Sequence, residues 1–168
     1  MIVRDNCHPT KAAMVPLFQI PMWIILSHSY RNLARLYPNP ADPASLMAFS
    51  QLQQEGILWF HDLTVPDPTG ILPVATALVN LTIIQLHVNE RRRNKLQDSF
   101  FIKFITNGGR LFSLIIVPIG LVMPADMSYY WLISSSVGLL QNILLMNPKF
   151  KTMMNINTPV TVGSGNKV

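Results

Sequence analysis

The sequence predicts an all-α membrane protein with four membrane-spanning helices. Of its 168 residues, 49% are hydrophobic and only 12% are charged, and the mean hydropathy is +0.30. An average soluble domain is about 25% charged, so this chain has too few charges to cover its surface with solvated groups. Four apolar segments without internal acidic or basic residues are the second observation, and an uneven distribution of Lys and Arg is the third.

Three of the apolar segments have the length of a membrane span. They cover residues 12–30, 70–88 and 127–146, which gives them 19, 19 and 20 residues. A helix needs about 20 apolar residues to cross the hydrocarbon core of a bilayer. Helices of a soluble bundle normally keep a polar face toward water, and these segments have none. We therefore interpret them as membrane spans.

The remaining apolar segment, residues 111–123, has only 13 residues, which corresponds to about 20 Å of helix. Starting the span near residue 105 brings in Arg110, and an earlier start also brings in Lys103. Long cationic side chains near a helix end can reach the headgroups. Two alternatives stay open, namely a short helix in a locally thin bilayer and a longer helix that begins among the headgroups.

Basic residues gather on one side of the membrane if the chain crosses it four times. The two ends and the 89–110 connection hold 11 of the 13 Lys and Arg, and only Arg31 and Arg35 lie on the other side. Loops on the inner side of a membrane carry such an excess. All four tyrosines lie at or near the outer boundary, where an aromatic belt is expected. Both signals predict that the two ends of the chain face the inner side.

The stretch GILWFHDLTVPDPTGILP precedes the second span on the outer side. His61, Asp62 and Asp67 lack further ligands at a recognisable spacing, so we expect no metal site. Trp59 and Phe60 are expected to lie in the membrane interface. Asp67 is expected to start the following helix, because a carboxylate is favourable at the positive N-terminal end.

Three motifs resemble the YidC/Oxa/Alb family of membrane insertases, and they occur in the family's order and spacing. They are PLFQIPMWI at residues 16–24, WFHDLTxxDPxxILP at 59–73 and YWLISSSVGLLQN at 130–142. RDNCHP before the first span and SYRNL after it are most similar to the mitochondrial branch that assembles cytochrome c oxidase. The likeness covers about residues 4–150.

The resemblance implies a five-helix insertase core, of which this chain holds the last four helices, at about 12–30, 70–88, 105–123 and 127–146. The first core helix, with the family's groove arginine, is expected upstream of residue 1. Residues 1–150 would form the core and 151–168 a disordered tail. The resemblance further implies insertion of mitochondrially made proteins, such as a cytochrome c oxidase subunit, into the mitochondrial inner membrane. The basic loops would face the matrix, and neither a cofactor nor bond-making chemistry is implied.

Polar residues inside the spans are the candidates for a substrate groove. An unsatisfied polar group costs several kcal/mol in a bilayer, and a wet groove partway across lowers that barrier. In the last span, Ser134 and Gln141 are seven positions apart, as are Ser135 and Asn142, so each pair shares a helix face and the four residues form one polar stripe. With the family's corresponding helices added, the predicted groove residues are Gln19, Gln85, Ser134, Ser135, Gln141 and Asn142. The alternative is that these groups hydrogen-bond between helices as packing contacts.

The 89–110 connection combines basic residues with three phenylalanines. Its candidate inner-face contact residues are Arg91, Arg92, Arg93 and Lys95. They are expected to contact membrane lipids or newly made polypeptides, although the orientation rule alone accounts for positive charge here. RNA is the other polyanion that such residues bind. Family members that hold ribosomes use a long basic tail, so we expect neither ribosome binding nor a stable nucleic-acid partner.

A small solute transporter or channel is the alternative function. A transporter normally shows internal repeats and charged groups within the membrane, and this sequence shows neither. An intramembrane protease would need a nucleophile and a base at a common depth, for which Ser135 and His28 are the available residues. The sequence therefore favours an insertase.

Overall fold

The computed structural model describes residues 9–34, 42–54, 56, 59, 61–97 and 99–154, with side chains described from residue 18 onward. Within these residues the chain forms six helices and no strand, which confirms the predicted all-α class. The helices are α1 (Pro9–Ala34), α2 (Pro43–Gln54), α3 (Ile71–Arg93), α4 (Phe100–Gly120), α5 (Ala125–Met146) and α6 (Pro148–Met153).

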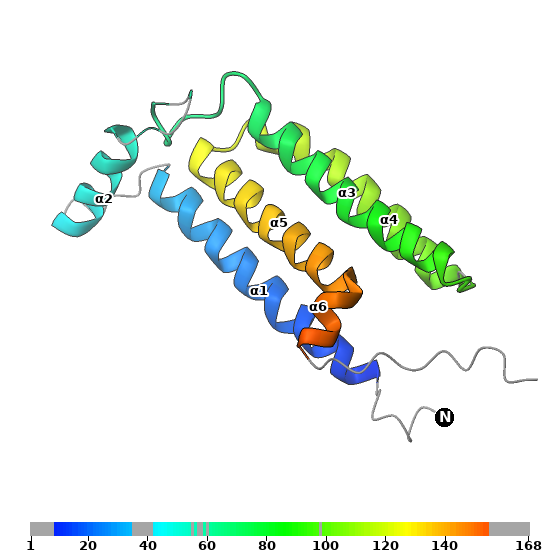
Figure 1. The fold of residues 1–168 in the computed structure, drawn as a ribbon. Coiled ribbons are helices and arrows are strands. Elements are labelled where there is room, and N and C mark those ends of the chain that lie inside the picture. The colour runs from blue at the N-terminus through cyan, green and yellow to red at the C-terminus, as the bar shows by residue number, and fades with distance from the viewer. Residues whose placement is uncertain are drawn as a thin grey trace, which may run out of the picture.

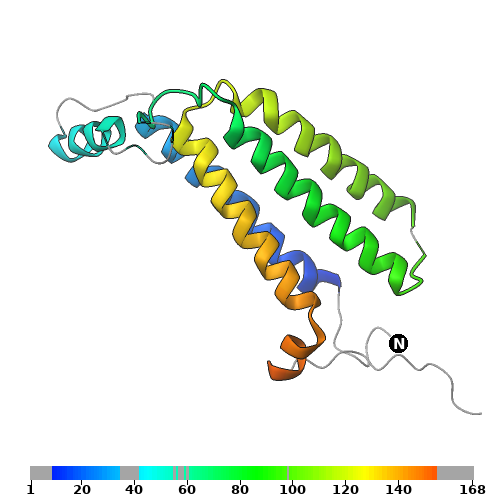
Figure 2. The ribbon, with the colours of Figure 1, turned by 45° about the horizontal axis from the view of Figure 1, so that its top comes forward.

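Four long helices lie side by side and form the body of the molecule (Figure 1). Helix α3 packs against both α4 and α5, and α1 packs along α5. The second view shows the same order, with α4 at one edge and α1 beside α5 (Figure 2). The short helix α2 lies at the end of the bundle where α3 and α5 begin, and α6 lies at the opposite end.

The lengths of the helices fit a bilayer. Among the described residues, α3 and α4 are long and apolar enough to be candidate membrane spans. Only 22% and 11% of their most apolar windows are buried, whereas the core helix of a soluble protein is mostly buried. Helices α1 and α5 have 26 and 22 residues. At 1.5 Å per residue, both exceed the hydrocarbon thickness of about 30 Å. The prediction of four membrane spans is thus supported by length and composition for α3 and α4, and it stays a prediction for α1 and α5.

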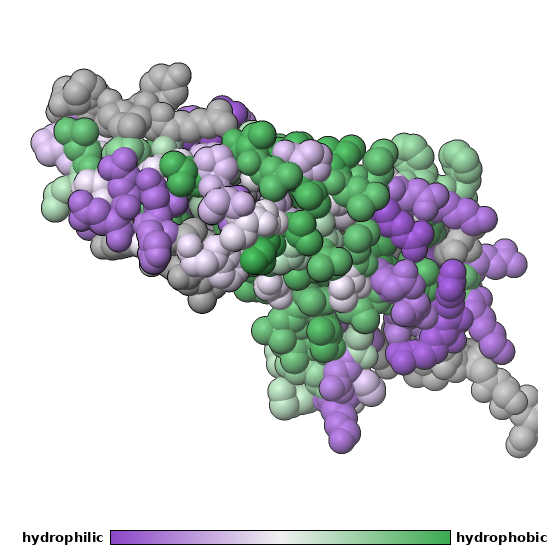
Figure 3. Space-filling model, turned by 90° about the horizontal axis from the view of Figure 1, so that it is seen from above, coloured by the Kyte–Doolittle hydropathy of each residue, from purple (hydrophilic) through white to green (hydrophobic). Residues whose placement is uncertain are grey.

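The surface of the bundle is apolar, and its tightest contacts are small and polar. A broad hydrophobic area covers the middle of the molecule, while hydrophilic residues gather toward its ends (Figure 3). Thr76, Ser113 and Ser128 are almost fully buried, and each donates its hydroxyl to a backbone carbonyl. Helices in lipid pack through small residues of this kind, because lipid solvates large apolar side chains as well as another helix does.

Helix α4 contains most of the third predicted span. It has 21 residues and begins at Phe100, where the Ser99 side chain accepts a hydrogen bond from the N–H of Ile102 at 3.4 Å. The helix therefore starts before the expected span of 105–123, because Ser99 caps it, and a turn before Pro124 ends it at Gly120. The bounds of the span stay a prediction. The apolar stretch is short, but the helix is not.

Sequence reasoning missed two short helices. Helix α2 lies in the connection between the first two predicted spans, where the sequence analysis predicted no helix. Helix α6 starts at Pro148 after Asn147, whose side chain accepts a hydrogen bond from the backbone N–H two residues later at 2.9 Å. This Asn-Pro pair is a helix-start signal that the sequence contains. Helix α6 enters the segment 151–168, which was expected to be a tail, and residues 155–168 lie outside the described part of the chain.

Candidate functional site

A network of hydrogen bonds around Asp67 holds the start of α3. One carboxylate oxygen of Asp67 accepts from the Thr69 hydroxyl at 2.7 Å and from the Trp59 indole N–H at 3.2 Å. The other oxygen accepts from the backbone N–H of Leu72 at 2.9 Å. Burial alone would raise the pKa of Asp67, but these hydrogen bonds hold that pKa below its usual value. The carboxylate is thus a structural acceptor.

The structure corrects how Asp67 caps α3. The helix begins at Ile71, with Gly70 as its N-cap in a left-handed conformation (φ 67°). Asp67 therefore caps the helix from outside its first turn and was wrongly expected to begin it. Trp59 is 39% exposed, and its indole N–H binds Asp67. Phe60, the other expected interface residue, lies outside the described residues.

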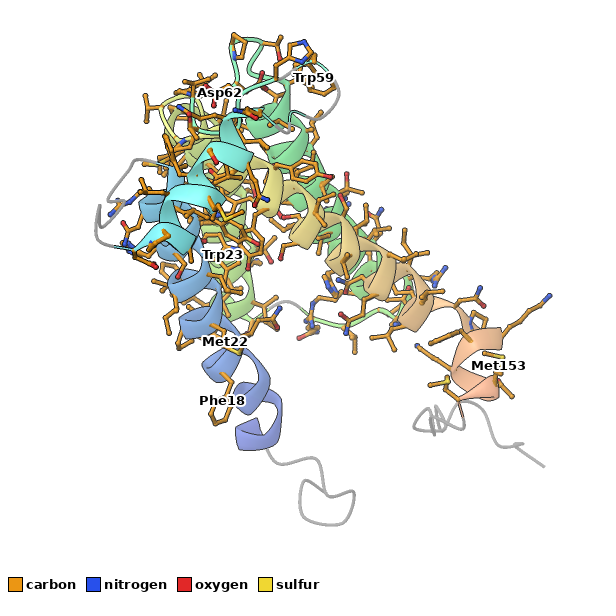
Figure 4. The ribbon with its side chains drawn as sticks, turned by 90° about the vertical axis from the view of Figure 1, so that its left-hand side faces the viewer. Phe18, Met22, Trp23, Trp59, Asp62 and Met153 are labelled. Carbon is orange, nitrogen blue, oxygen red and sulfur yellow. The ribbon has the colours of Figure 1, made fainter. Side chains whose placement is uncertain are left out.

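The same stretch binds the start of α5. The backbone N–H of Ala125 donates to the Val65 carbonyl at 2.8 Å, and the N–H of Asp126 donates to the Leu63 carbonyl at 3.1 Å. We call residues 61–73 together with 124–128 the outer cap. In Figure 4, Trp59 and Asp62 lie together at this end of the molecule, away from Met153 of α6. The outer cap joins the beginnings of two neighbouring helices.

His61 and Asp62 also fall in the outer cap. The backbone N–H of Thr64 donates to the Asp62 carboxylate at 2.8 Å, and His61 is exposed. In the described part of the chain, no three His, Cys, Asp or Glu side chains gather closely enough to hold a metal ion. The acidic residues of this stretch act as hydrogen-bond acceptors for turns.

Aromatic contacts join α1 to α5. Trp23 stacks on Trp131 with ring centroids 5.5 Å apart, and Tyr30 stacks on Tyr130 at 5.0 Å. The indole N–H of Trp131 also donates to the Ser27 hydroxyl at 3.0 Å. Offset aromatic pairs add about 0.5–1.5 kcal/mol each beyond the area that they bury. These contacts fix α1 beside α5 and leave space on both sides of Trp23.

The larger space is a cleft of about 550 Å³ that reaches all four long helices. Its lining consists of Ile20, Trp23, Ile24, Asn80, Phe112, Ile116, Trp131 and Ser135. Asn80 of α3 and Ser135 of α5 are its polar residues, and the side chain of neither makes a hydrogen bond with another described residue. The apolar side chains around them include exposed Ile20 and Phe112 and buried Ile116, so the cleft offers two uncommitted polar groups within an apolar wall.

A second cavity of about 430 Å³ shares Trp23 with the cleft. It contains Gln19 of α1 and Ser134 of α5, beside Phe18 and Met22. Figure 4 shows Phe18, Met22 and Trp23 following one another along α1. No residue that lines either cavity is charged.

The structure brings three of the six predicted groove residues to these cavities, namely Gln19, Ser134 and Ser135. The other three lie elsewhere. The Gln85 side chain donates to Asn89 at 2.8 Å and accepts from Arg110 of α4 at 3.4 Å. Gln141 is exposed, and the Asn142 amide donates to the Gly138 carbonyl of its own helix at 2.8 Å.

Asn80 is the cleft residue that the predicted groove set omitted. The signal for it was present, because Asn80 is an amide in the middle of the apolar segment 70–88. Sequence reasoning weighed the last span more heavily, since its polar residues are more numerous. The packing of the helices decides which of their faces meet, and it places Asn80 in the cleft.

The predicted inner-face residues also separate into two groups. Arg93 forms an ion pair with Glu90, and Lys95 occupies the turn after α3 with a φ of 51°. Arg91 and Arg92 instead line a pocket between α3 and α4, together with two further basic residues from α4.

The helical fold, its apolar exterior and the two candidate spans are typical of a multi-helix membrane protein. The family model described as "60Kd inner membrane protein" matches residues 3–153. The chain belongs to this family, the YidC/Oxa membrane insertases, whose members are not enzymes. The resemblance predicted from the three motifs is confirmed.

Curated relatives come from mitochondria. The chain is 42% identical over 156 residues to "Cytochrome c oxidase assembly protein COX18, mitochondrial" of Pongo abelii, and 40% identical to its counterpart in Homo sapiens. Each alignment covers 93% of this chain and 45% of the relative. "Mitochondrial inner membrane protein OXA1L" of Mus musculus is 30% identical over 144 residues, which are 85% of this chain and 29% of that protein. The chain thus spans less than half the length of these relatives. No solved structure matches it.

Proposed function

We propose that this chain forms part of an insertase of the mitochondrial inner membrane that assists cytochrome c oxidase assembly. Its relatives named for that assembly match almost the whole chain. Helices α1, α3, α4 and α5 would be the four spans, with both ends and the basic connection in the matrix. The substrates would be newly made inner-membrane proteins, a cytochrome c oxidase subunit among them.

The cleft with its two uncommitted polar groups carries this proposal. A polar segment that enters a bilayer loses its hydrogen bonds to water, at a cost of several kcal/mol for each unsatisfied group. Asn80 and Ser135 would replace some of those bonds inside the membrane. Since neither residue is charged, they would hold a passing segment only weakly. Exposed Ile20 and Phe112 at the wall would let an apolar segment leave into the lipid.

Site-specific photo-crosslinking tests the cleft. A photoreactive residue replaces Ser135 in the full-length protein, in mitochondria that make labelled proteins. The matched control replaces Val137 on the same helix, which is 59% exposed. We expect an adduct with a newly made oxidase subunit from position 135 and none from position 137. Equal adducts at both positions, or no protein adduct from a stably embedded protein, would reject the cleft, and the second outcome would reopen the transporter alternative.

Thiol labelling tests the orientation. With Cys7 replaced by Ser, single cysteines are introduced at exposed His61 in the outer cap and at exposed Asn94 after α3. An impermeant thiol reagent added to mitochondria with a ruptured outer membrane should label position 61 only. Labelling of position 94 alone would reverse the proposed topology.

A further inference from the structure

A pocket of about 230 Å³ lies between the inner halves of α3 and α4, and it is strongly basic. Its polar lining consists of Arg91, Arg92, Lys103, Thr106, Asn107 and Arg110. On α4 the four polar residues recur every three or four positions, so they share the helix face that is turned toward α3. We call this site the basic pocket.

Four cations line the basic pocket, and none of its lining residues is acidic. Glu90, the acidic residue of α3 in this region, is paired with Arg93, which is not part of the lining. Two of the guanidinium groups are held in place, because Arg91 donates to the Gln97 carbonyl at 3.0 Å and Arg110 donates to Gln85 at 3.4 Å. Like charges that are fixed close together repel each other, and a bound anion removes that repulsion.

An exposed apolar surface of α4 borders the basic pocket. Phe100, Phe101 and Phe104 are 86%, 67% and 67% exposed. Further along the helix, Leu111 and Leu114 continue the same exposed apolar surface into the membrane half of α4. A ligand in the basic pocket would thus meet cations and, beside them on the same helix, an exposed apolar surface.

The basic pocket also reaches below the membrane surface. Lys103 and Arg110 are seven residues apart, which places them about 10 Å apart along the helix axis. Arg110 lies near the middle of α4. RNA or a soluble acidic peptide would touch only the outermost cations and would leave the phenylalanines without a partner. A molecule that has both phosphate groups and acyl chains fits both surfaces.

We propose that the basic pocket binds the phosphate groups of an anionic phospholipid, and that a doubly charged headgroup is preferred. Guanidinium groups bind phosphate through paired, charge-assisted hydrogen bonds, and basic pockets between membrane helices accept such headgroups. The acyl chains would run along the exposed Phe100–Phe104 face. The inference rests on the membrane placement in the proposed function. It accounts for the basic and the exposed apolar side chains in the first half of α4, because that half would lie beside the bound lipid.

Lipid titration of the whole chain in neutral detergent tests the proposal, with bound lipid counted by native mass spectrometry. The probes are cardiolipin with two phosphates, phosphatidylglycerol with one, and phosphatidylcholine with no net charge. The pocket variant is Arg92→Gln with Lys103→Gln, which changes one residue on each helix. The matched control is Arg93→Gln with Lys95→Asn, which removes the same charge outside the basic pocket, and asparagine tolerates the left-handed backbone at position 95.

We expect the unmodified chain to prefer cardiolipin over phosphatidylglycerol and to ignore phosphatidylcholine. The pocket variant should bind cardiolipin on the order of 30-fold more weakly, because each cation near an anionic lipid contributes about 1 kcal/mol. The control should change binding less than about threefold, since one of its two cations is already paired with Glu90.

Three outcomes would overturn the proposal. Equal losses in both variants would mean general attraction to a basic surface, without a pocket. Competition by glycerol phosphate at the same concentration as cardiolipin would mean a site for soluble phosphate. Retention of a short RNA or an acidic peptide, but not of cardiolipin, would assign another partner. None of these outcomes changes the crosslinks expected from Ser135, so failure here is distinguishable from failure of the proposed function.

Discussion

The outer cap and the cleft are built from similar residues, but they use them differently. In the outer cap, the Asp67 carboxylate accepts hydrogen bonds from a tryptophan, a threonine and the backbone. In the cleft, the polar groups of Asn80 and Ser135 make no hydrogen bond with another described residue. The motif at residues 59–73 therefore holds helices together. The proposed function instead depends on the side chains of Asn80 and Ser135, which make no hydrogen bond with another described residue.

Removing the central acceptor of the outer cap should have the largest effect on stability. Asp67→Ala leaves the buried N–H of Leu72 without its acceptor and removes the hydrogen bond to the Trp59 indole. We expect a loss of about 2–4 kcal/mol in the free energy of unfolding, because an unpaired buried donor is costly and bonds to a charged group are strong. Thermal unfolding of the purified chain in detergent measures it.

Asp42→Ala is the matched control for this change. Asp42 accepts from the N–H of Ala44 at 3.2 Å and from the Ser45 hydroxyl, at the exposed start of α2. Its loss should leave the unfolding temperature of the bundle unchanged. If the two alanine variants behaved alike, the outer cap would not be the element that joins α3 to α5.

Two glycines of α4 allow the packing at the outer end of the bundle to be compared with the packing nearer its inner end. A Cβ at Gly120 would lie 2.5 Å from the Cβ of Pro73, but a Cβ at Gly108 would meet nothing within 4 Å. Gly120→Ala should destabilise the chain by about 1–3 kcal/mol through overpacking. Gly108→Ala should stabilise it by about 0.5–1 kcal/mol, because alanine loses less backbone entropy in a helix. Equal shifts in unfolding temperature would contradict the close contact between α3 and α4.

The sequence was sufficient for features that depend on local pattern. Apolar run lengths predicted the long helices, and the three motifs predicted the family that the comparison confirms. Partnerships across the bundle were not predictable, because they join residues far apart in the chain. The Gln85–Arg110 contact links positions 25 residues apart, and the Trp131–Ser27 contact links positions 104 residues apart. Spacing alone also placed the last span's polar residues in one stripe, whereas packing divides them among two cavities and the helix surface.

The cleft residues should affect insertion more than stability. With Asn80→Leu and Ser135→Leu combined, we expect insertion of the substrate to fall roughly five- to tenfold, since each intramembrane hydrogen bond contributes about 0.6 kcal/mol or more. The protein should stay in the membrane at its normal level. The control is Thr82→Leu on α3, because the exposed Thr82 hydroxyl donates to a carbonyl of its own helix at 2.8 Å. Insertion unchanged in the double variant would leave the cleft as a packing feature.

Asn142 should give the smallest effect, and it separates the predicted stripe from the observed cleft. Its amide donates to the Gly138 carbonyl one turn earlier and lines neither of the two cavities. That carbonyl keeps its place in the helix when the amide is lost, so Asn142→Leu should change insertion by less than about twofold. Ser135→Leu alone should already exceed that change in the same labelled-translation assay. A larger loss from Asn142→Leu than from Ser135→Leu would move the groove toward the inner end of α5 and would favour the continuous stripe over the cleft.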